Sequence, residues 1–336
     1  MILYDPFGGP YRRYDPTGSG ERWEIRRTVG GVCWVVLSGV LLMSVVLPIV
    51  GKVYLQRFGF TFLEQNDFGG LPPVMYYLLL SVDYIVGLAL PAFLYFYAKR
   101  IPLWQGLPFR RTSALDLFLY VAFGSMVCML ANYPANLVSE IQEAFGFSGE
   151  LPSMPLTDDL PVLILYGVDV VLIPPLVEEI LFRGMVLQSL RRYGDGFAVL
   201  FSAMLFGLYH GNFIQMAFAF FCGLALGFAV IRTDSLLPAI LIHLINNGVS
   251  LAIELVSRYR GEQAALAADH AATICLIAAG ALALALLFAR RKLFSGRSGA
   301  SMLPLSSRMG AAFSNGGALV FVLYSLVSSV YVLQNA

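Results

Sequence analysis

Long apolar runs recur along the whole chain, and they constrain its fold more than any other feature. A helix needs about 20 apolar residues to cross the hydrocarbon of a bilayer. Runs that fit this template lie near 29–50, 74–98, 115–138, from about 161, 213–231, 236–256, 271–289 and 317–334, with a shorter run at 197–210. The sequence therefore predicts an all-α, polytopic membrane protein with eight or nine transmembrane helices.

Composition excludes several classes of protein. Of the 336 residues, 58% are hydrophobic and only 13% are charged, which fits neither a soluble domain nor a disordered chain. The net charge of +1 gives no reason to expect a nucleic-acid partner. The cysteines stand alone in apolar runs without the paired spacing of a metal or redox centre, so we interpret them as packing residues: Cys33, Cys128, Cys222 and Cys275.

The distribution of Lys and Arg predicts the orientation in the membrane. Basic residues follow the run at 74–98, the core of the run that starts near 161, and the run at 271–289. They are Lys99, Arg100, Arg110, Arg111, Arg183, Arg191, Arg192, Arg290, Arg291 and Lys292. The loops at 51–73 and 139–159 are comparatively acidic. Because cytoplasmic loops carry the excess of positive charge, we expect a cytoplasmic N-terminus. Short tails and compact loops favour an integral protein of a bacterial plasma membrane.

Two adjacent carboxylates, Glu178 and Glu179, lie inside the fourth apolar run. A carboxylate in hydrocarbon costs about 2.5–3.5 kcal/mol on insertion scales, so such residues face a partner or a water-filled cavity and indicate a functional site. Glu179 precedes Arg183 by four residues, the spacing of a helical ion pair. Glu178 points about 100° away around the helix and has no local partner.

Two histidines lie in later apolar runs. Glu178 and His210 are each 16 residues from Gly194, so a hairpin at 194–196 would place them at a similar depth. His243 and Asn247 are four residues apart and share one helix face. His243 follows Ser235 by only about 12 Å of helix, against about 24 Å for the hairpin arms, so helix tilt has to close that gap.

Three short motifs contain these residues in order. They read Glu-Glu-x-x-x-Arg at Glu178, Glu179 and Arg183, Phe-x-x-x-His at Phe206 and His210, and His-x-x-x-Asn at His243 and Asn247. Their order on membrane spans resembles the CAAX protease and bacteriocin-processing family of intramembrane peptidases, also called the Abi family. The resemblance covers about 160–256.

The resemblance implies a glutamate-dependent endopeptidase with a conical catalytic cavity in the membrane, which we expect to face the cytosol. Its site residues would be Glu178, Glu179, His210, His243 and Asn247, with Arg183 and Phe206 as structural support. Glu178 would activate a water that His210 holds, and His243 and Asn247 would donate to the oxyanion of the scissile carbonyl. Glu179 would fix the helix through Arg183. No cofactor is implied.

These inferences divide the chain into four parts. We predict a cytosolic N-terminal tail at 1–28 and N-terminal transmembrane helices at 29–159. The catalytic membrane core would cover 160–256, and C-terminal transmembrane helices with a Ser- and Gly-rich linker would cover 257–336. The substrate would be a membrane-associated peptide or protein, either prenylated or a precursor of a bacteriocin or signal peptide, and the sequence does not choose between these.

Other readings of the same residues remain. Glu178, His210 and His243 could bind zinc as a membrane metallopeptidase, although no His-Glu-x-x-His helix is present. The chain could also be a non-catalytic scaffold or immunity protein, or a transporter that relays protons through Glu178 and His210. Pro174 and Pro175 either open room for water or simply kink the helix. Gly223 and Gly227 indicate close helix packing, and His270 receives no role.

Overall fold

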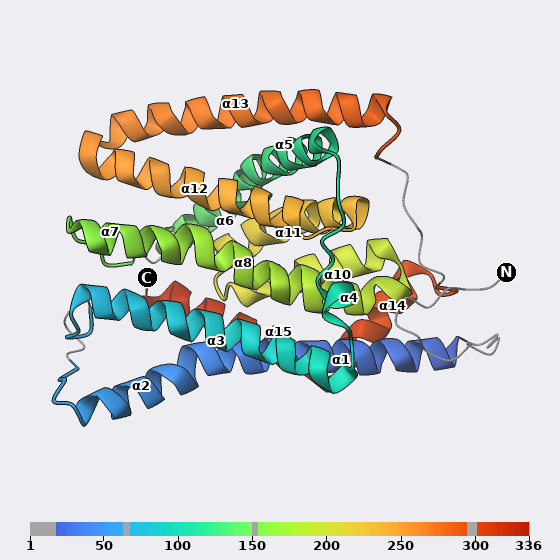
Figure 1. Cartoon of the computed structure of the whole chain (residues 1–336), viewed down its shortest axis with the longest axis horizontal. Helices are drawn as coiled ribbons and strands as arrows, with labels where there is room; N and C mark the ends of the chain where they lie inside the picture. The colour runs from blue at the N-terminus through green and yellow to red at the C-terminus, as the bar shows by residue number, and fades with distance from the viewer. Residues whose placement is uncertain (1–17, 63–67, 150–153, 294–300, 336) are drawn as a thin grey trace.

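The protein is an all-α, polytopic membrane protein (Figure 1). The structure, a computed structural model, describes residues 18–62, 68–149, 154–293 and 301–335. Within these ranges there is no strand, only an isolated bridge between Phe109 and Ser235. Eight helical segments of the described chain are long and apolar enough to cross a membrane: Ser19–Gln56, Pro73–Lys99, Ala114–Ala144, Leu160–Tyr193, Phe213–Thr233, Leu237–Arg260, Glu262–Ala289 and Gly316–Gln334.

Several of these segments contain more than one helical element. The first consists of α1 (Ser19–Leu41), the π segment η1 (Leu42–Val46) and α2 (Leu47–Gln56), and the third of α5 (Ala114–Leu130) and α6 (Asn132–Ala144). The fourth consists of α7 (Leu160–Gly167), η2 (Val168–Leu172), α8 (Ile173–Glu179), η3 (Ile180–Val186), α9 (Leu187–Leu190) and η4 (Arg191–Tyr193). The remaining elements are α3 (Pro73–Lys99), α4 (Leu103–Gly106), α10 (Asp195–Tyr209), α11 (Phe213–Thr233), α12 (Leu237–Arg260), α13 (Glu262–Ala289), α14 (Leu305–Phe313) and α15 (Gly316–Asn335).

Two helices begin earlier than the apolar runs predict. α13 begins at Glu262 rather than near 271, and α1 begins at Ser19 rather than near 29. The polar first turns of α1 are helical because they pack on the C-terminal segment: Ile25 is fully buried, and Arg26 donates to the Ser314 carbonyl at 2.9 Å. The part of the predicted tail from residue 19 is therefore helix, whereas residues 1–17 lie outside the described residues.

The two ends of the bundle differ in charge. We call the end formed by the start of α1, η4, the start of α12, the end of α13 and α14 the basic end, and the opposite end the distal end. Four described basic residues lie at the distal end: Lys52, Arg57, Arg258 and Arg260. Fourteen lie at the basic end: Arg22, Arg26, Arg27, Lys99, Arg100, Arg110, Arg111, Arg191, Arg192, Arg232, Arg290, Arg291, Lys292 and Arg308.

Ion pairs join the helices at the basic end. Arg191 and Arg110 both pair with Asp234, at 2.5 and 3.0 Å. Arg290 and Lys292 pair with Asp116 at 3.2 and 3.1 Å. At the distal end, Asp158 accepts hydrogen bonds from Arg258 and Tyr259, and these bonds hold the pKa of Asp158 below its ordinary value.

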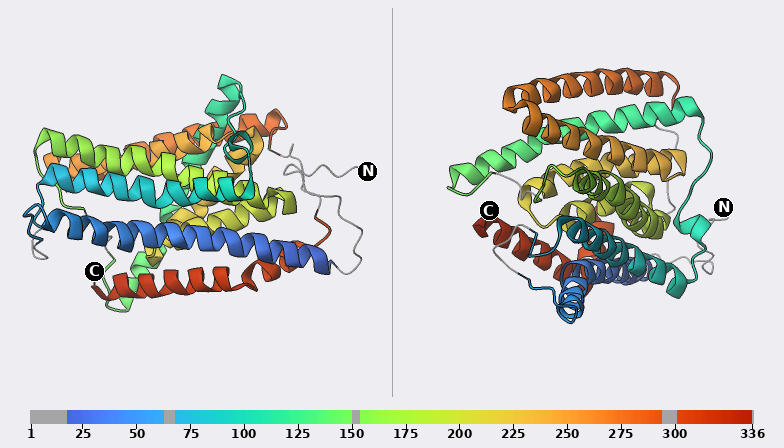
Figure 2. Two further views of the ribbon diagram at one scale, coloured as in Figure 1. Left: turned by 60° about the horizontal axis from the view of Figure 1, so that its bottom comes forward. Right: turned by 60° about the vertical axis from the view of Figure 1, so that its left-hand side comes forward.

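The α10–α11 hairpin enters the bundle from the basic end and turns back inside it. α10 has 15 residues, which is about 22 Å of helix against about 30 Å of hydrocarbon. The chain turns at 210–212, where Gly211 has a φ of 63° and Asn212 caps α11 by accepting from the Gln215 amide. The tip stops short of the distal end in Figure 1, and Figure 2 shows the same hairpin inside the bundle from two other sides.

Close packing of this hairpin depends on Gly207, since a Cβ there would lie 2.8 Å from the Met216 carbonyl oxygen. We predict that Gly207→Ala destabilises the fold by about 1–3 kcal/mol, because backbone atoms must shift. Gly196→Ala in the same helix is the control, because its Cβ would have no neighbour within 4 Å. Thermal unfolding in detergent measures the difference, and equal melting temperatures would contradict the close approach.

Candidate active site

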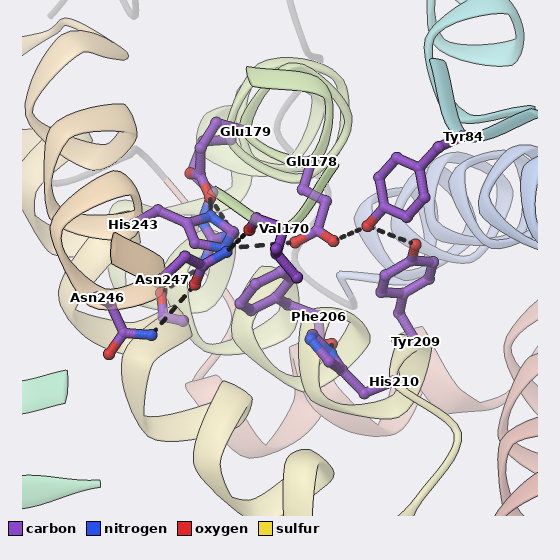
Figure 3. A network of polar contacts seen from close by, with 12 residues as sticks. Tyr84, Val170, Glu178, Glu179, Phe206, Tyr209, His210, His243, Asn246 and Asn247 are labelled. Carbon is purple, nitrogen blue, oxygen red and sulfur yellow. Dashed lines mark hydrogen bonds and ion pairs between the residues drawn. The ribbon is translucent and has the colours of Figure 1, made fainter. Parts of the chain in front are cut away.

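Glu178 lies in the middle of the bundle with only 3% of its surface exposed. Its Oε1 accepts a hydrogen bond from the Tyr84 hydroxyl of α3, and the Tyr209 hydroxyl donates to Tyr84 Oη at 3.1 Å (Figure 3). Its Oε2 is buried and accepts no hydrogen bond from the described residues. One oxygen of this carboxylate is therefore fixed, and the other remains available to a ligand or to water.

Glu179 is fully buried and holds two partners with one oxygen. Its Oε1 accepts from Arg183 Nη1 at 3.0 Å and lies 3.0 Å from His243 Nδ1. The ion pair predicted between Glu179 and Arg183 is thus present. Glu179 also connects two spans, because His243 lies on α12.

Arg183 is also fully buried, and its guanidinium interacts with neighbouring protein groups in place of solvent. Nη2 donates to the Gly223 carbonyl at 3.3 Å, and the guanidinium lies 4.2 Å from the centre of the Phe206 ring. A Cβ at Gly223 would lie 3.3 Å from Arg183 Nη2 and 2.9 Å from the Ala203 Cα. The packing predicted for Gly223 is therefore real, and it also admits the guanidinium.

His243 lies between the two carboxylates. Nδ1 faces Glu179 and Nε2 lies 3.8 Å from Glu178 Oε2. An ionised carboxylate only accepts hydrogen bonds, so the contact with Glu179 assigns the proton to Nδ1. In the neutral ring Nε2 then carries no proton and can only accept, and it faces Glu178 Oε2, which also accepts. A proton or a water molecule has to lie between Nε2 and Glu178 Oε2.

His210 follows α10 at the hairpin tip and lines the same cavity as Glu178. Its Nδ1 bonds the Phe206 carbonyl oxygen at 2.8 Å, so this nitrogen carries the proton and Nε2 is the nitrogen left for a ligand. The Phe206 ring packs edge-on against both His210 and His243, with ring centroids 5.0 and 5.9 Å apart. Phe206 thereby separates the two imidazoles and covers Arg183.

Asn247 has a structural partner that the sequence motifs did not indicate. Its Nδ2 donates to the Val170 carbonyl at 2.9 Å. In an α-helix that carbonyl would accept from residue 174, and in a π-helix from residue 175. Both positions are proline, which has no N–H. The two prolines thus leave a carbonyl unpaired within helix Leu160–Tyr193, and Asn247 of α12 satisfies it.

Three residues near the site were missed from the sequence. Tyr84 and Tyr209 hold Glu178, and Asn246 donates from Nδ2 to Asn247 Oδ1 at 3.3 Å while its own Oδ1 is buried without a partner among the described residues. Tyrosine occurs 17 times in the chain, so nothing in the local sequence distinguishes Tyr84. Asn246 is next to the motif residue Asn247 in the sequence, and this adjacency is the one feature that could have indicated it.

A cavity of about 670 Å³ connects these residues. Its apolar wall includes Cys128, Cys222 and Leu226. Its polar lining includes Asn132, Asn136, Gln215, Asn246, Ser250 and Glu254. Of the lining residues, Ser44, Asn132, Asn136, Ser250 and Glu254 are exposed. On α12 the lining runs from His243 towards the distal end. The sequence led us to expect that the basic end is cytoplasmic and that the cavity faces the cytosol. A cavity that extends towards the opposite end does not fit both expectations.

The residues of the zinc alternative do not form a ligand set. Within the described chain, no group of three His, Cys, Asp or Glu side chains is arranged to hold a metal ion. Nδ1 of His210 contacts a backbone carbonyl and Nδ1 of His243 contacts Glu179, so Nε2 is the ring nitrogen that each histidine has left for a ligand. The cysteines are all free thiols, with Cys33, Cys128 and Cys222 buried and Cys275 exposed.

Comparison with known proteins places the central segment in a family. Residues 160–249 match the family model described as type II CAAX prenyl endopeptidase, Rce1-like. The match covers α7 to α12 and includes every motif residue. It leaves Tyr84 outside. No curated protein and no solved structure matches the chain.

The contact between Asn247 and Val170 makes a stability prediction. Asn247→Ala removes the side-chain partner of the part-buried Val170 carbonyl, so we expect a loss of about 1 kcal/mol in the free energy of unfolding. In a Pro174→Ala background the new N–H of residue 174 can bond Val170, so the same substitution should cost less there. A double-mutant cycle in detergent measures this coupling. Equal costs in both backgrounds would show that Asn247 does not serve that carbonyl.

Proposed function

We propose that this chain, whose residues 160–249 match the type II CAAX prenyl endopeptidase family model, hydrolyses a peptide bond within the membrane with a water activated by Glu178. The family match and the eight apolar helices of the described chain support a protease-like enzyme of the membrane. The observation that carries the proposed mechanism is the unpaired Oε2 of Glu178, buried beside His243 Nε2 on the cavity wall.

The water in this proposal lies between Glu178 and His243. It donates one hydrogen to Glu178 Oε2 and the other to His243 Nε2, which satisfies two facing acceptors and leaves its oxygen lone pair for attack. As the oxygen bonds to the scissile carbonyl carbon, Glu178 takes the proton. Glu178 then returns a proton to the amide nitrogen as the carbon–nitrogen bond breaks.

The geometry favours a revised division of roles among the remaining motif residues. A neutral His243 has no proton on Nε2, so it suits the water better than the oxyanion. Asn247 has a second N–H besides the one given to Val170, and Asn246 also has a second N–H. These amides are our candidates for the oxyanion donors, each worth about 3–4 kcal/mol of barrier. His210 Nε2 remains available on the cavity wall for water or the leaving group.

Glu179, Arg183 and Phe206 act in this proposal by positioning. Glu179 sets the tautomer and direction of the His243 ring, and Arg183 neutralises Glu179 in a site with no exposed surface. The Phe206 ring lies against the guanidinium and both imidazoles. The reaction as proposed uses no metal.

Replacing Glu178 with Gln tests the reaction. We predict that Glu178→Gln abolishes cleavage, because the amide cannot accept the water proton, while the amount of folded protein in the membrane is retained. Membrane proteomics that compares wild type with Glu178→Gln identifies the cleavages that depend on this carboxylate. Glu254→Gln is the matched control, since Glu254 lines the same cavity but bonds Tyr166.

The same comparison separates the alternatives. Unchanged cleavage or an unchanged cellular phenotype in Glu178→Gln would indicate a scaffold rather than an enzyme. Loss of activity on stripping metal, with recovery on adding zinc, would indicate a metallopeptidase. We expect cleavage to resist chelators.

Tyr84 gives a second prediction. Tyr84→Phe removes a hydrogen bond to a charged group, worth about 1.5–3 kcal/mol, so we predict a fall in kcat of roughly 10- to 100-fold. KM should change little, because Tyr84 holds the base rather than the substrate. Tyr97→Phe on the same helix is the control, since Tyr97 is 85% exposed. A normal kcat in Tyr84→Phe would show that the hydroxyl does not position Glu178.

A further inference from the structure

We infer that the catalytic cavity opens on the non-cytoplasmic side of the membrane and accepts an extended, polar peptide segment presented from that side. The inference deepens the proposed function and rests on it for the identity of the reaction. It departs from the expectation that the cavity faces the cytosol. Three observations carry it: the length of α10, the charge of the two ends, and the chemistry of the cavity lining.

The length of α10 sets where the cavity lies. The hairpin enters from the basic end and ends at His210, Gly211 and Asn212, before the distal end is reached. The space between this tip and the distal end is enclosed by other helices, and residues at the tip line the cavity. The tip itself is buried and Asn212 is hydrogen-bonded within it, whereas the polar side chains that line the cavity beyond the tip require water. That water enters where the lining is exposed.

Four of the five exposed lining residues lie on α6 and on the distal half of α12, and the fifth, Ser44, lies on η1 within the first span. Asn132 and Asn136 lie at the start of α6, after α5 has run inward from its ion pairs at the basic end. Ser250 and Glu254 lie on α12 beyond His243, and α12 ends beside Asp158 at the distal end. The wall formed by Cys128 and Cys222 is apolar and buried. The cavity is thus closed on that wall and exposed along its distal lining.

The charge of the ends assigns a side of the membrane to this opening. Fourteen described basic residues lie at the basic end and four at the distal end. Because cytoplasmic loops carry the excess of Lys and Arg, this asymmetry assigns the basic end to the cytoplasmic side. The described acidic residues are spread more evenly, with Glu140, Glu143, Asp158, Asp159, Glu254, Glu262 and Asp269 in the distal half and Glu21, Glu24, Asp116, Asp195 and Asp234 at the basic end, so the net positive charge stays at the basic end. The distal opening therefore faces away from the cytoplasm.

The lining indicates the class of substrate. Apolar side chains such as Ile214, Phe218 and Leu251 share the lining with polar ones. Most of the polar ones are neutral amides and hydroxyls, including Asn132, Asn136, Gln215, Asn246, Asn247 and Ser250. Such groups both donate and accept, as the backbone of an extended peptide does. Glu254 is the carboxylate of the distal lining, and Tyr166 donates to both of its oxygens. We infer a substrate segment that enters unfolded, from an exported peptide or the external part of a membrane protein.

Single-cysteine labelling of the full-length chain in a bacterial plasma membrane tests the direction of the opening. Cys275 is exposed and is first replaced by Ser, whereas the other three cysteines are buried, and the parent without an added thiol gives the background. Ser250→Cys reports the cavity. Gln263→Cys at the start of α13 reports the distal surface, and Ser306→Cys on α14 reports the basic end, because both positions are exposed.

We expect a membrane-impermeant maleimide to label Ser250→Cys and Gln263→Cys in intact cells, and Ser306→Cys only in inverted vesicles. Labelling of Ser250→Cys only in inverted vesicles, as expected for Ser306→Cys, would overturn the inference. Protection of Ser250→Cys from the reagent on both sides of the membrane would also overturn it. Labelling of Gln263→Cys from the cytoplasmic side alone would overturn the orientation. Combining Ser250→Cys with Glu178→Gln should leave labelling unchanged, because access does not require catalysis.

The substrate class has a separate readout. Cleavages lost in Glu178→Gln should map to segments outside the cytoplasm, and a cytosolic prenylated C-terminus as the substrate would contradict the inference. Loss of these cleavages together with cytoplasmic labelling of Ser250→Cys would retain the reaction and reject the direction. External labelling with unchanged cleavage in Glu178→Gln would retain the direction and reject the reaction.

Discussion

The site depends on one buried carboxylate oxygen, Oε1 of Glu179, which binds Arg183 and His243 at 3.0 Å each. A charge with no exposed surface is tolerated only when it is paired and its other groups are bonded, and removing one partner of a buried pair costs about 3–5 kcal/mol. Arg183 meets part of that requirement through Gly223 and the Phe206 ring, while Arg183 Nε and Glu179 Oε2 are buried without a hydrogen bond from the described residues. Glu179, Arg183, Phe206 and His243 are therefore one connected unit, and His243 takes its direction from that unit.

A second constraint acts on the backbone of the same helix. Pro174 and Pro175 deprive the Val170 carbonyl of both helical donors, and in a bilayer such a group needs a partner from another element. Asn247 supplies it from α12. Together with the contact from Glu179 to His243, this joins the fourth span and α12 at two levels on either side of Glu178. The two prolines therefore do more than kink the helix or open room for water. They also leave the carbonyl that fixes the position of Asn247.

Much of the fold follows from hydropathy, because lipid forces long apolar runs into helices. The predicted runs at 74–98 and 213–231 became α3 and α11 with ends shifted by two residues at most. The early starts of α1 and α13 escaped prediction because their first turns are polar. For α1 the reason is contact with residues far away in the chain, such as Ser314. Hydropathy measures only the preference for lipid and contains no information on such contacts.

The site was predictable in its residues and less so in its contacts. Spacing identified Glu178, His210 and His243 as candidates, and the gap expected from the short path between Ser235 and His243 is closed, since His243 Nε2 lies 3.8 Å from Glu178 Oε2. The tautomer of His243 and the partner of Asn247 depend on which atoms of other helices come within hydrogen-bond distance. Tyr84 comes from a span without any motif. Its hydroxyl needs a partner when buried, but sequence alone does not say which one.

The two expectations about orientation conflict for a physical reason that only the hairpin reveals. A charge bias determines which end of a bundle stays in the cytoplasm, but it does not determine which end of a cavity is open. Access is determined by which helices fail to cross, and among the apolar helices of the described chain α10, with 15 residues, is too short to cross. Because α10 enters from the basic end, the space left beyond its tip lies on the opposite side. His210 lies at that tip, and Glu178 and His243 line the same cavity, so the proposed chemistry belongs to whichever compartment fills the space.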